Sequence, residues 1–275
     1  MEQSASRRRA ARGGRSSLRD RLVLASTSLV LVLSGCAHDE RKQPIRVAAA
    51  SDLVMAFTAL GGEFERATGE RVQFTFGSTG LLARQLRERA PFDMFAAASA
   101  SFVDQVVQAG VCDGRTRALY GRGRIALWVK QAAGAPSTLE ALRAPRFKRI
   151  AIANPEHAPY GRAARQALEQ KQLFAELEPR IVYAENVRQA LQYAQAGSVE
   201  AALVALSLVI ADESGSFVQI DDGLHAPIDQ ELVACTQGAR SEGGRRFAEY
   251  VAQRGRATMR RYGFLLPGER QVRRP

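Results

Sequence analysis

The chain has 275 residues, enough for one large domain or two of ordinary size, and its 46% apolar and 24% charged residues exclude global disorder. The net charge of +11 is concentrated in the first 35 residues, since the rest of the chain carries 32 basic and 26 acidic side chains. These basic residues form no stripe interleaved with aromatic residues, which disfavours a nucleic-acid-binding protein. With three His and three Cys we expect neither a metal ion nor a cofactor.

Residues 1–35 predict a targeting segment, because seven arginines precede an apolar stretch, Leu22 to Leu33, that is too short to span a bilayer comfortably. The stretch ends in Leu33-Ser34-Gly35-Cys36, which resembles the lipobox of bacterial lipoproteins. The resemblance implies that Cys36 carries a lipid, that residues 36–43 form a tether, and that the protein is anchored to a membrane in the periplasm. Two alternatives stay open: an ordinary cleaved signal peptide, and a twin-arginine signal of which only the arginine pair is present.

From Ile45 onward, apolar strand patterns alternate with amphipathic helical patterns. The patterns predict strands at 45–50, 71–76, 92–97, 124–130, 150–153, 180–184, 201–206 and 231–236. They predict helices at 53–68, 81–89, 99–109, 138–143, 161–170, 186–196 and 243–254. This alternation is typical of parallel sheets wrapped by helices, and about nine strands fit two small α/β lobes better than one sheet.

Four predicted strand-to-helix turns are rich in small or hydroxyl residues: Ala50-Ser51-Asp52, Gly77 to Gly80, the turn that ends at Tyr160-Gly161, and Glu185-Asn186-Val187. Ligands of open α/β sheets bind at the carboxyl ends of the strands, where helix N-termini offer unpaired N–H groups. Each turn alone is most simply a helix cap. Four turns at corresponding positions predict an anion-binding cleft that needs no Lys or Arg.

Several ordered motifs carry a family resemblance. They are Val47-Ala48-Ala49-Ala50-Ser51, Phe74 to Gly80, Pro91 to Phe95, Asn154 to Gly161, Glu185 to Leu191, Val204 to Ser207, Leu224 to Ile228 and Tyr262-Gly263-Phe264. With them the chain resembles periplasmic molybdate-binding proteins of ABC transporters over about residues 44–267. The resemblance implies a two-lobed periplasmic-binding-protein fold of type II, with mixed or parallel sheets flanked by helices and a hinge between the lobes.

The resemblance also implies the boundaries of the parts. Lobe 1 would comprise residues 44–121 and 227–267, lobe 2 residues 122–226, and the tail residues 268–275. The chain would cross between the lobes near Gly121-Arg122-Gly123 and near His225-Ala226-Pro227, where glycine and proline suit a hinge.

For the site, the resemblance implies a tetrahedral oxyanion, molybdate or tungstate, held by neutral donors from both lobes. Ser51 and Ser78 match hydroxyl donors, Ser78 together with its backbone N–H, and Val187 matches a backbone N–H donor. In the turn before Gly161, Tyr160 matches a phenol donor of one branch of the family and Ala158 a backbone donor of another. The backbone N–H of Asp52 would also face the ligand if its side chain turns away. It further implies a monomer whose partners are a membrane permease and its ATPase. No nucleophile lies beside a recognisable base in the sequence, so we expect a binding protein rather than an enzyme. A receptor for another oxyanion or anionic solute, and an enzyme or sensor on the same fold, remain alternatives.

Asp52 departs from the pattern, because similar proteins often have Asn at this position. A carboxylate about 4 Å from a unit negative charge costs on the order of 4 kcal/mol at an effective dielectric constant of about 20. We therefore expect its side chain to turn away and cap the helix, while weaker affinity or a different ligand remain alternatives.

Four further residues have structural interpretations. Cys112 and Cys235 could form a disulfide in an oxidising compartment or remain two buried thiols. We expect His157 to act without touching the ligand, and Asp93 either to cap an element or to form hydrogen bonds between elements.

Overall fold

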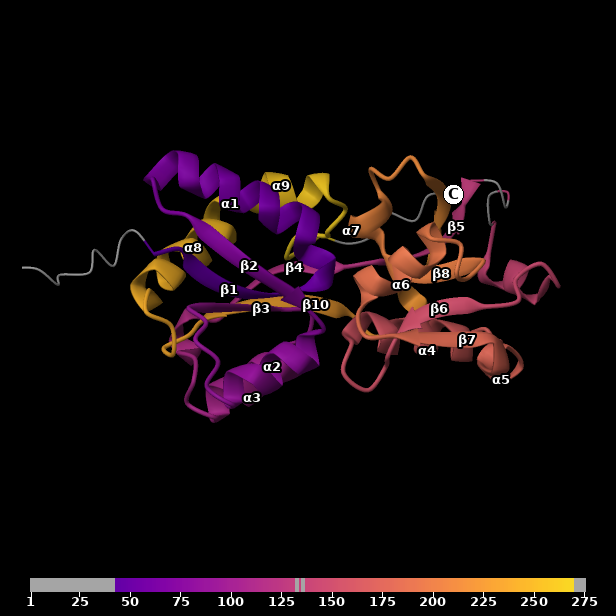
Figure 1. Cartoon of the computed structure of the whole chain (residues 1–275), viewed down its shortest axis with the longest axis horizontal. Helices are drawn as coiled ribbons and strands as arrows, with labels where there is room; N and C mark the ends of the chain where they lie inside the picture. The colour runs from indigo at the N-terminus through magenta and orange to yellow at the C-terminus, as the bar shows by residue number, and fades with distance from the viewer. Residues whose placement is uncertain (1–42, 132–133, 135–136, 270–275) are drawn as a thin grey trace, which may run out of the picture. The chain divides into compact units, whose positions relative to one another are not determined.

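The computed structural model describes residues 43–131, 134 and 137–269, so the expectations for the targeting segment, for Cys36 and for the tail beyond residue 269 lie outside the described residues. The described chain forms two five-stranded sheets (Figure 1). The strand order is β2-β1-β3-β10-β4 in the first sheet and β7-β6-β8-β5-β9 in the second. Within the described residues, no helix is both long enough and apolar enough to cross a membrane.

The first sheet combines strands from both ends of the described chain: β1 Ile45–Ala50, β2 Val72–Gly77, β3 Met94–Ala97, β4 Ala118–Gly123 and β10 Ile228–Ala234. β1 pairs in parallel with β2 and β3, whereas β10 runs antiparallel to β3 and β4. The register of β10 against β4 shifts between Gln230 and Glu231, which is a β-bulge.

The second sheet contains β5 Ile125–Lys130, β6 Ile150–Ala153, β7 Ile181–Ala184, β8 Ala201–Ala205 and β9 Gly215–Gln219. β6 is parallel to β7 and β8, and β5 is antiparallel to β8 and β9. Both sheets are therefore mixed. The strands β6, β7, β8 and β9 run in one direction, and only β5, between β8 and β9, runs in the opposite direction.

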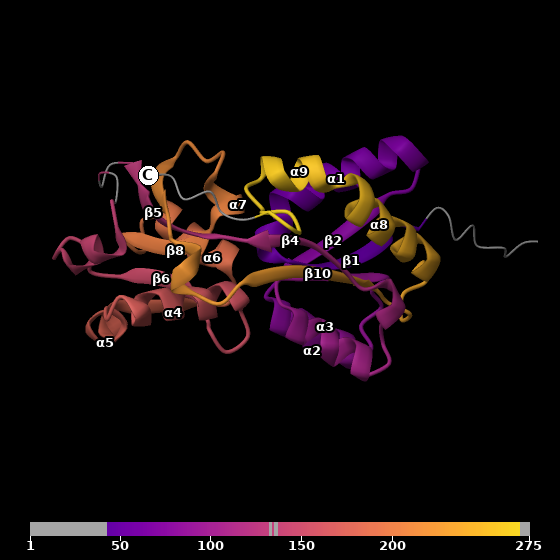
Figure 2. The same ribbon diagram turned by 180° about the vertical axis from the view of Figure 1, so that it is seen from behind.

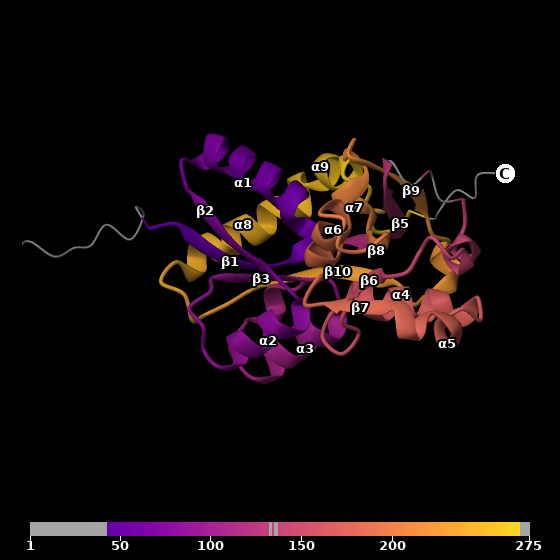
Figure 3. The same cartoon turned by 45° about the vertical axis from the view of Figure 1, so that its right-hand side comes forward.

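Helices cover the sheets: α1 Val54–Thr68, α2 Thr79–Arg87, α3 Ala100–Gln108, α4 Pro159–Gln170, α5 Phe174–Leu177, α6 Val187–Gln195, α7 Leu206–Val209, α8 Ser241–Arg254 and α9 Arg256–Arg261. α2 and α3 lie on one face of the first sheet, and α1 and α8 lie on the other (Figures 1 and 2). In the second sheet, α4 packs against β6 and β8, and α6 packs against β5, β6 and β8 (Figure 3).

In helix α1, the apolar residues that recur at helical spacing in the sequence form one buried face. Phe57, Leu60 and Phe64 recur at helical spacing and are all buried, which stabilises the helix through its packed face. The helix ends at Gly69, whose φ of 75° is the left-handed conformation that glycine adopts without strain. Short 3-10 turns complete the described elements: η2 Ser51–Leu53, η3 Gly114–Thr116, η5 Leu139–Arg143, η6 Glu178–Arg180 and η7 Asp222–Leu224.

Buried side chains form two clusters. The larger cluster includes residues of both sheets, with Trp128 of β5 and Phe247 of α8 fully buried. The smaller cluster lies under α2 and α3 and includes Leu82, Phe95 and Val106. Of the two roles expected of Asp93, the structure shows the bonds between elements, since its two carboxylate oxygens accept the N–H groups of Arg46 and Arg240, each at 2.7 Å.

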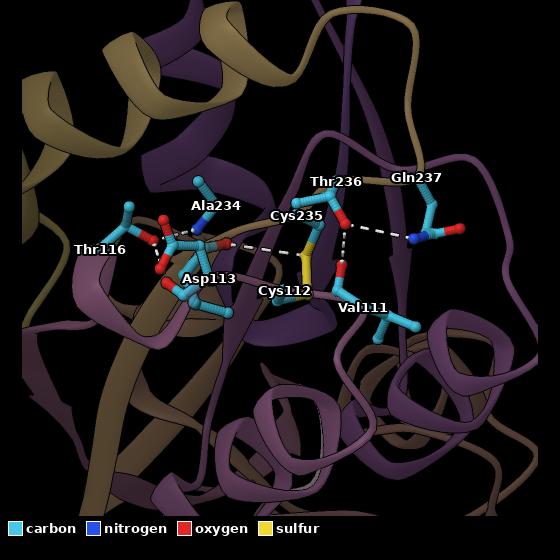
Figure 4. The surroundings of a disulfide bond; sticks show 9 residues. Val111, Cys112, Asp113, Thr116, Ala234, Cys235, Thr236 and Gln237 are labelled. Atoms are coloured by element: carbon cyan, nitrogen blue, oxygen red, sulfur yellow. Dashed lines mark hydrogen bonds between the residues drawn. A yellow bond between two sulfur atoms is a disulfide. The ribbon is translucent and has the colours of Figure 1, made fainter.

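Cys112 and Cys235 are joined in a disulfide, so the alternative of two free thiols is not what the structure contains (Figure 4). The bond connects the segment after α3 with the end of β10, across a sequence separation of 123 residues. Backbone hydrogen bonds flank it, because Asp113 N donates to Ala234 O at 2.9 Å and Thr236 N donates to Val111 O at 3.0 Å. The disulfide therefore fastens a loop to the first sheet.

Candidate functional site

A pocket lies where the predicted turns converge. Its lining is Ala50, Ser51, Asp52, Gly77, Ser78, Thr79, Ala158, Pro159, Tyr160, Asn186 and Val187. All four turns contribute, two from the first sheet and two from the second, and all six predicted contact residues are among the lining residues. The cavity volume is about 10 Å³, close to the minimum of about 10–15 Å³ that one water molecule needs. A tetrahedral oxyanion is larger, so its entry requires the lining to move.

Helix starts surround the pocket. α2 begins directly after Ser78, α4 begins at Pro159, and α6 begins at Val187. Asn186 caps α6 by accepting the N–H of Gln189 at 3.0 Å. Helix N-termini carry a partial positive charge and unpaired N–H groups, which favour an anion. Among the predicted backbone donors, the N–H of Ala158 already donates to Asn154 O at 2.9 Å, so this donor is used within its own turn.

Ser78 links the two sides of the pocket. Its hydroxyl donates to the carbonyl oxygen of His157 at 2.7 Å, and its oxygen lies 2.9 Å from Nδ1 of the same histidine. The N–H of Gly80 donates to the same carbonyl oxygen at 2.9 Å. A Cβ on Gly80 would lie 2.8 Å from that oxygen and 2.9 Å from Phe102, so this close approach needs glycine. His157 itself is not among the lining residues.

The contact between Ser78 and His157 was not foreseen from the sequence, because the two residues are 79 positions apart. A hydroxyl beside an imidazole nitrogen has the outline of a nucleophile and its base. In this pair, however, the hydroxyl proton is directed to a main-chain carbonyl at 2.7 Å.

Asp52 occupies the centre of a buried hydrogen-bond network. Its Oδ2 accepts hydrogen bonds from the hydroxyl of Tyr160 at 2.9 Å and from Nε2 of Gln230 at 2.8 Å. The expected helix cap is therefore not formed, because two side-chain donors from distant elements bind the carboxylate instead. Its own carbonyl oxygen accepts the hydroxyl of Ser207 at 2.8 Å. The side chain is 1% exposed.

Burial dominates the electrostatics of this network. It raises the pKa of Asp52 to about 7, although the hydrogen bonds from Tyr160, from its own backbone N–H and from Gln230 act in the opposite direction. Burial, followed by the nearby charge of Asp52, also raises the pKa of Tyr160 and of Tyr120 well above the ordinary value. Both phenols therefore remain neutral donors while the carboxyl group can change its charge near neutral pH.

Gln230 and Tyr120 are the residues that sequence reasoning missed. Gln230 is fully buried, and its Oε1 accepts the hydroxyl of Tyr120 at 3.3 Å. It lies 178 positions from Asp52 and reaches it through the order of strands in the first sheet. Gln230 lies one residue before the strand predicted at 231–236, whereas the observed β10 begins at Ile228, so the misplaced start of the strand hid it. Gly123 makes room for the network, since a Cβ there would lie 2.0 Å from the Tyr160 hydroxyl oxygen.

The lining carries hydrogen-bond donors and one carboxyl group. Among the described residues that line the pocket, none is Lys, Arg or His. Across residues 43–131, 134 and 137–269, no group of three His, Cys, Asp or Glu side chains is arranged to hold a metal ion. The arrangement can bind a small anion through neutral donors, and the carboxyl group of Asp52 limits the charge that the pocket accepts.

Two mixed sheets with a pocket formed by turns from both are the arrangement of a solute-binding protein. Residues 45–265 match the family described as bacterial extracellular solute-binding protein, and the chain belongs to this family. This membership confirms the expected fold class and places the chain among binding proteins rather than enzymes.

Two curated relatives and one solved structure are similar to this chain over most of its length. The chain is 28% identical over 245 residues to the molybdate-binding protein ModA of Rhodobacter capsulatus, covering 89% of this chain and 96% of the relative. It is 29% identical over 250 residues to ModA of Azotobacter vinelandii, covering 90% and 97%. The solved structure of the Azotobacter vinelandii periplasmic molybdate-binding protein matches with a TM-score of 0.76 and 27% identity, covering 81% of this chain and 99% of that one. The resemblance to this family is confirmed.

Proposed function

We propose that this protein binds molybdate in the pocket between its two sheets and delivers it to the membrane permease of an ABC importer, which an ATPase partner drives. The observation that carries the proposal is the pocket itself, in which Ser51 and Ser78 of the first sheet face Tyr160 and Val187 of the second. The names of the relatives supply the choice of anion. Tungstate has the same charge and shape, so we include it in the proposal.

Capture would proceed by exchange of hydrogen bonds. The hydroxyl groups of Ser78 and Tyr160, which now donate to His157 O and to Asp52, would turn to the oxygens of the anion. A hydrogen bond to a charged group contributes about 1.5–3 kcal/mol, so a few such bonds hold the anion firmly. Neutral donors leave the anion its own charge, which allows its release to the permease.

Closure would follow from donors on both sides. In this proposal lobe 1 comprises residues 44–121 and 227–267, and lobe 2 comprises residues 122–226, with the hinge at the two crossings. The strand order supports the division, since the chain leaves the first sheet after β4 and returns to it with β10. An anion that contacts both lobes favours the closed arrangement by the contacts it makes only there.

The proposed function includes a lipid anchor that holds the protein at a membrane. We place a lipid on Cys36, a tether at residues 36–43 and the binding protein, as a monomer, in the periplasm. A Cys36→Ala variant should leave the membrane fraction while its purified form binds molybdate like the wild type. A variant that stays in the membrane fraction would contradict the lipid anchor.

Isothermal titration calorimetry of the purified protein tests the ligand. Molybdate and tungstate should bind with one site per chain, and sulfate, which is smaller, should bind at least about a hundredfold more weakly because it cannot reach the donors of both lobes in the closed pocket at once. The Asp52 carboxyl group favours one alternative, a receptor for a different anion. Tight binding of phosphate or sulfate with no binding of molybdate would establish that alternative.

A further inference from the structure

The hydroxyl of Tyr160 cannot serve two acceptors at once. A phenol has one O–H proton, and here it is donated to Asp52 Oδ2 at 2.9 Å. Gln230 Nε2 donates to the same oxygen at 2.8 Å, so Oδ2 acts as the acceptor expected of an ionised carboxylate. In this arrangement the donor needed for the anion is occupied by Asp52.

Asp52 also opposes the anion directly. Its side chain lines a cavity of about 10 Å³ and is 1% exposed, so little water separates it from any ligand in the pocket. An ionised Asp52 carboxylate and an oxyanion in the same small, buried pocket repel each other strongly. The hydrogen bonds to Asp52 come from neutral groups, Tyr160 and Gln230, which do not cancel its charge.

A proton on the Asp52 carboxyl group removes the charge repulsion and frees the Tyr160 hydroxyl to donate to the anion. We propose that the protein takes up one proton together with its oxyanion, and that Asp52 holds this proton in the complex; this deepens the proposed function and rests on it. The proton comes from solvent, one O–H bond forms on Asp52 and no bond of the anion breaks. Asp52 Oδ2–H then donates to the oxygen of Tyr160, whose own proton becomes available to the anion. Gln230 Nε2 lies 3.4 Å from the Tyr160 oxygen and can donate there.

The surroundings of Asp52 make it the group that titrates. Its pKa is raised to about 7 by burial, and the approach of an anion raises it further. Tyr160 on α4 and Tyr120 on β4 stay neutral, since their pKa values lie well above the ordinary value. The other elements packed against this turn place Gly77 of β2 and Ser207 of α7 near it.

Two charged residues lie next to the residues of α6 and β10 that surround Asp52. Arg188, which follows Val187 in α6, is exposed. Glu231, which follows Gln230 in β10, is paired with Arg117 at 2.6 Å. Arg188 therefore offers Asp52 no close countercharge, and the charge of Glu231, which has the same sign as that of Asp52, is offset by Arg117.

Calorimetry in two buffers of different ionisation enthalpy counts the protons taken up. Molybdate keeps no proton of its own in neutral to alkaline water, so we expect the wild type to take up close to one proton per molybdate at about pH 8. The apparent Kd should rise by up to about tenfold per pH unit from about pH 7 to about pH 9. Asp52→Asn should bind molybdate without proton uptake and with a flat pH profile.

The matched control is Asp222→Asn, which removes another carboxyl group whose pKa burial raises, outside the pocket. It should keep the proton uptake of the wild type. Wild-type binding without proton uptake, or an Asp52→Asn protein that still takes up the proton, would overturn the inference and leave the proposed function intact. Absence of molybdate binding at every pH would instead refute the proposed function. The wild-type proton count does not depend on the folding of any variant.

Discussion

The hydroxyl of Ser78 donates a hydrogen bond of 2.7 Å to the carbonyl oxygen of His157. Ser78 follows β2 of the first sheet, and His157 precedes α4, which packs on the second sheet. The group that we propose as an anion donor therefore also closes the pocket across the two sheets. An anion must compete with this carbonyl oxygen for the same proton.

Substitution of Ser78 by alanine tests its role as a donor. The loss of one hydrogen bond to a charged group, about 1.5–3 kcal/mol, should raise the Kd for molybdate by about 10- to 100-fold. Ser99→Ala is the matched control, because the Ser99 hydroxyl bonds to Ser101 outside the pocket and its loss should leave the Kd unchanged. Equal affinities of the two variants would show that Ser78 does not bind the anion.

A methyl group on Gly80 should hold the two sides of the pocket apart. Its Cβ would lie 2.8 Å from His157 O and 2.9 Å from Phe102, closer than packed atoms tolerate. We expect Gly80→Ala to raise the Kd about tenfold or more, because the closed arrangement becomes less favourable. Gly62→Ala is the control, since its Cβ has as nearest neighbour only the end of Arg66 at 3.5 Å. Unchanged binding by Gly80→Ala would contradict closure at this contact.

Asp52→Asn should stabilise the protein without ligand in a pH-dependent manner. The folded protein raises the pKa of Asp52 from 3.8 to about 7, so the folded state binds this proton more tightly than the unfolded state. The stability that Asp52 contributes therefore falls as the pH rises from about 4 to about 7. Relative to the wild type, the variant should gain up to about 4 kcal/mol over this window and stay constant above it.

Urea unfolding followed by tryptophan emission measures this difference. The chain has one tryptophan, Trp128, which is fully buried in β5 and reports loss of the core. The two proteins should have similar free energies of unfolding at about pH 4. A difference that does not change with pH would mean that Asp52 is not the group with the raised pKa.

Reduction of the Cys112–Cys235 bond should lower stability and leave binding intact. The bond closes a loop of 123 residues, and loss of such a bond costs about 2–5 kcal/mol of unfolding free energy. The disulfide does not line the pocket, so the Kd for molybdate should change by less than about twofold under reducing conditions in which the protein remains folded. A parallel loss of affinity would show that the bond shapes the pocket.

Local patterns predicted much of the fold. The alternation from Ile45 onward predicted β1, α1, β2 and α2 to within two residues at each end, because apolar periodicity and Gly69 mark where these elements begin and end. β4 was missed because Gly121, Arg122 and Gly123 break the strand pattern within it. The strand and helix alternation alone indicated parallel sheets, whereas the family resemblance also allowed the mixed sheets that the structure contains, since strand direction is set by pairing between distant segments.

The candidate site was likewise predicted only in part from the sequence. Ser51, Ser78, Tyr160 and Val187 were predicted to share one pocket because turns at the carboxyl ends of strands bind ligands and the family resemblance places the turns of both lobes around one anion. The partners of Asp52 were not, because Gln230 comes from a strand near the other end of the chain. The direction of a single side chain depends on such tertiary partners, which local sequence does not contain.

A crystal structure of the protein grown with sodium molybdate, with anomalous scattering recorded at the molybdenum absorption edge, tests the central claim most directly. We expect one strong anomalous peak between the turns of Ser51, Ser78 and Tyr160, with their hydroxyl oxygens within hydrogen-bond distance of the anion. A peak at another place, or a pocket without one in protein that is folded and crystallised with the salt, would contradict it.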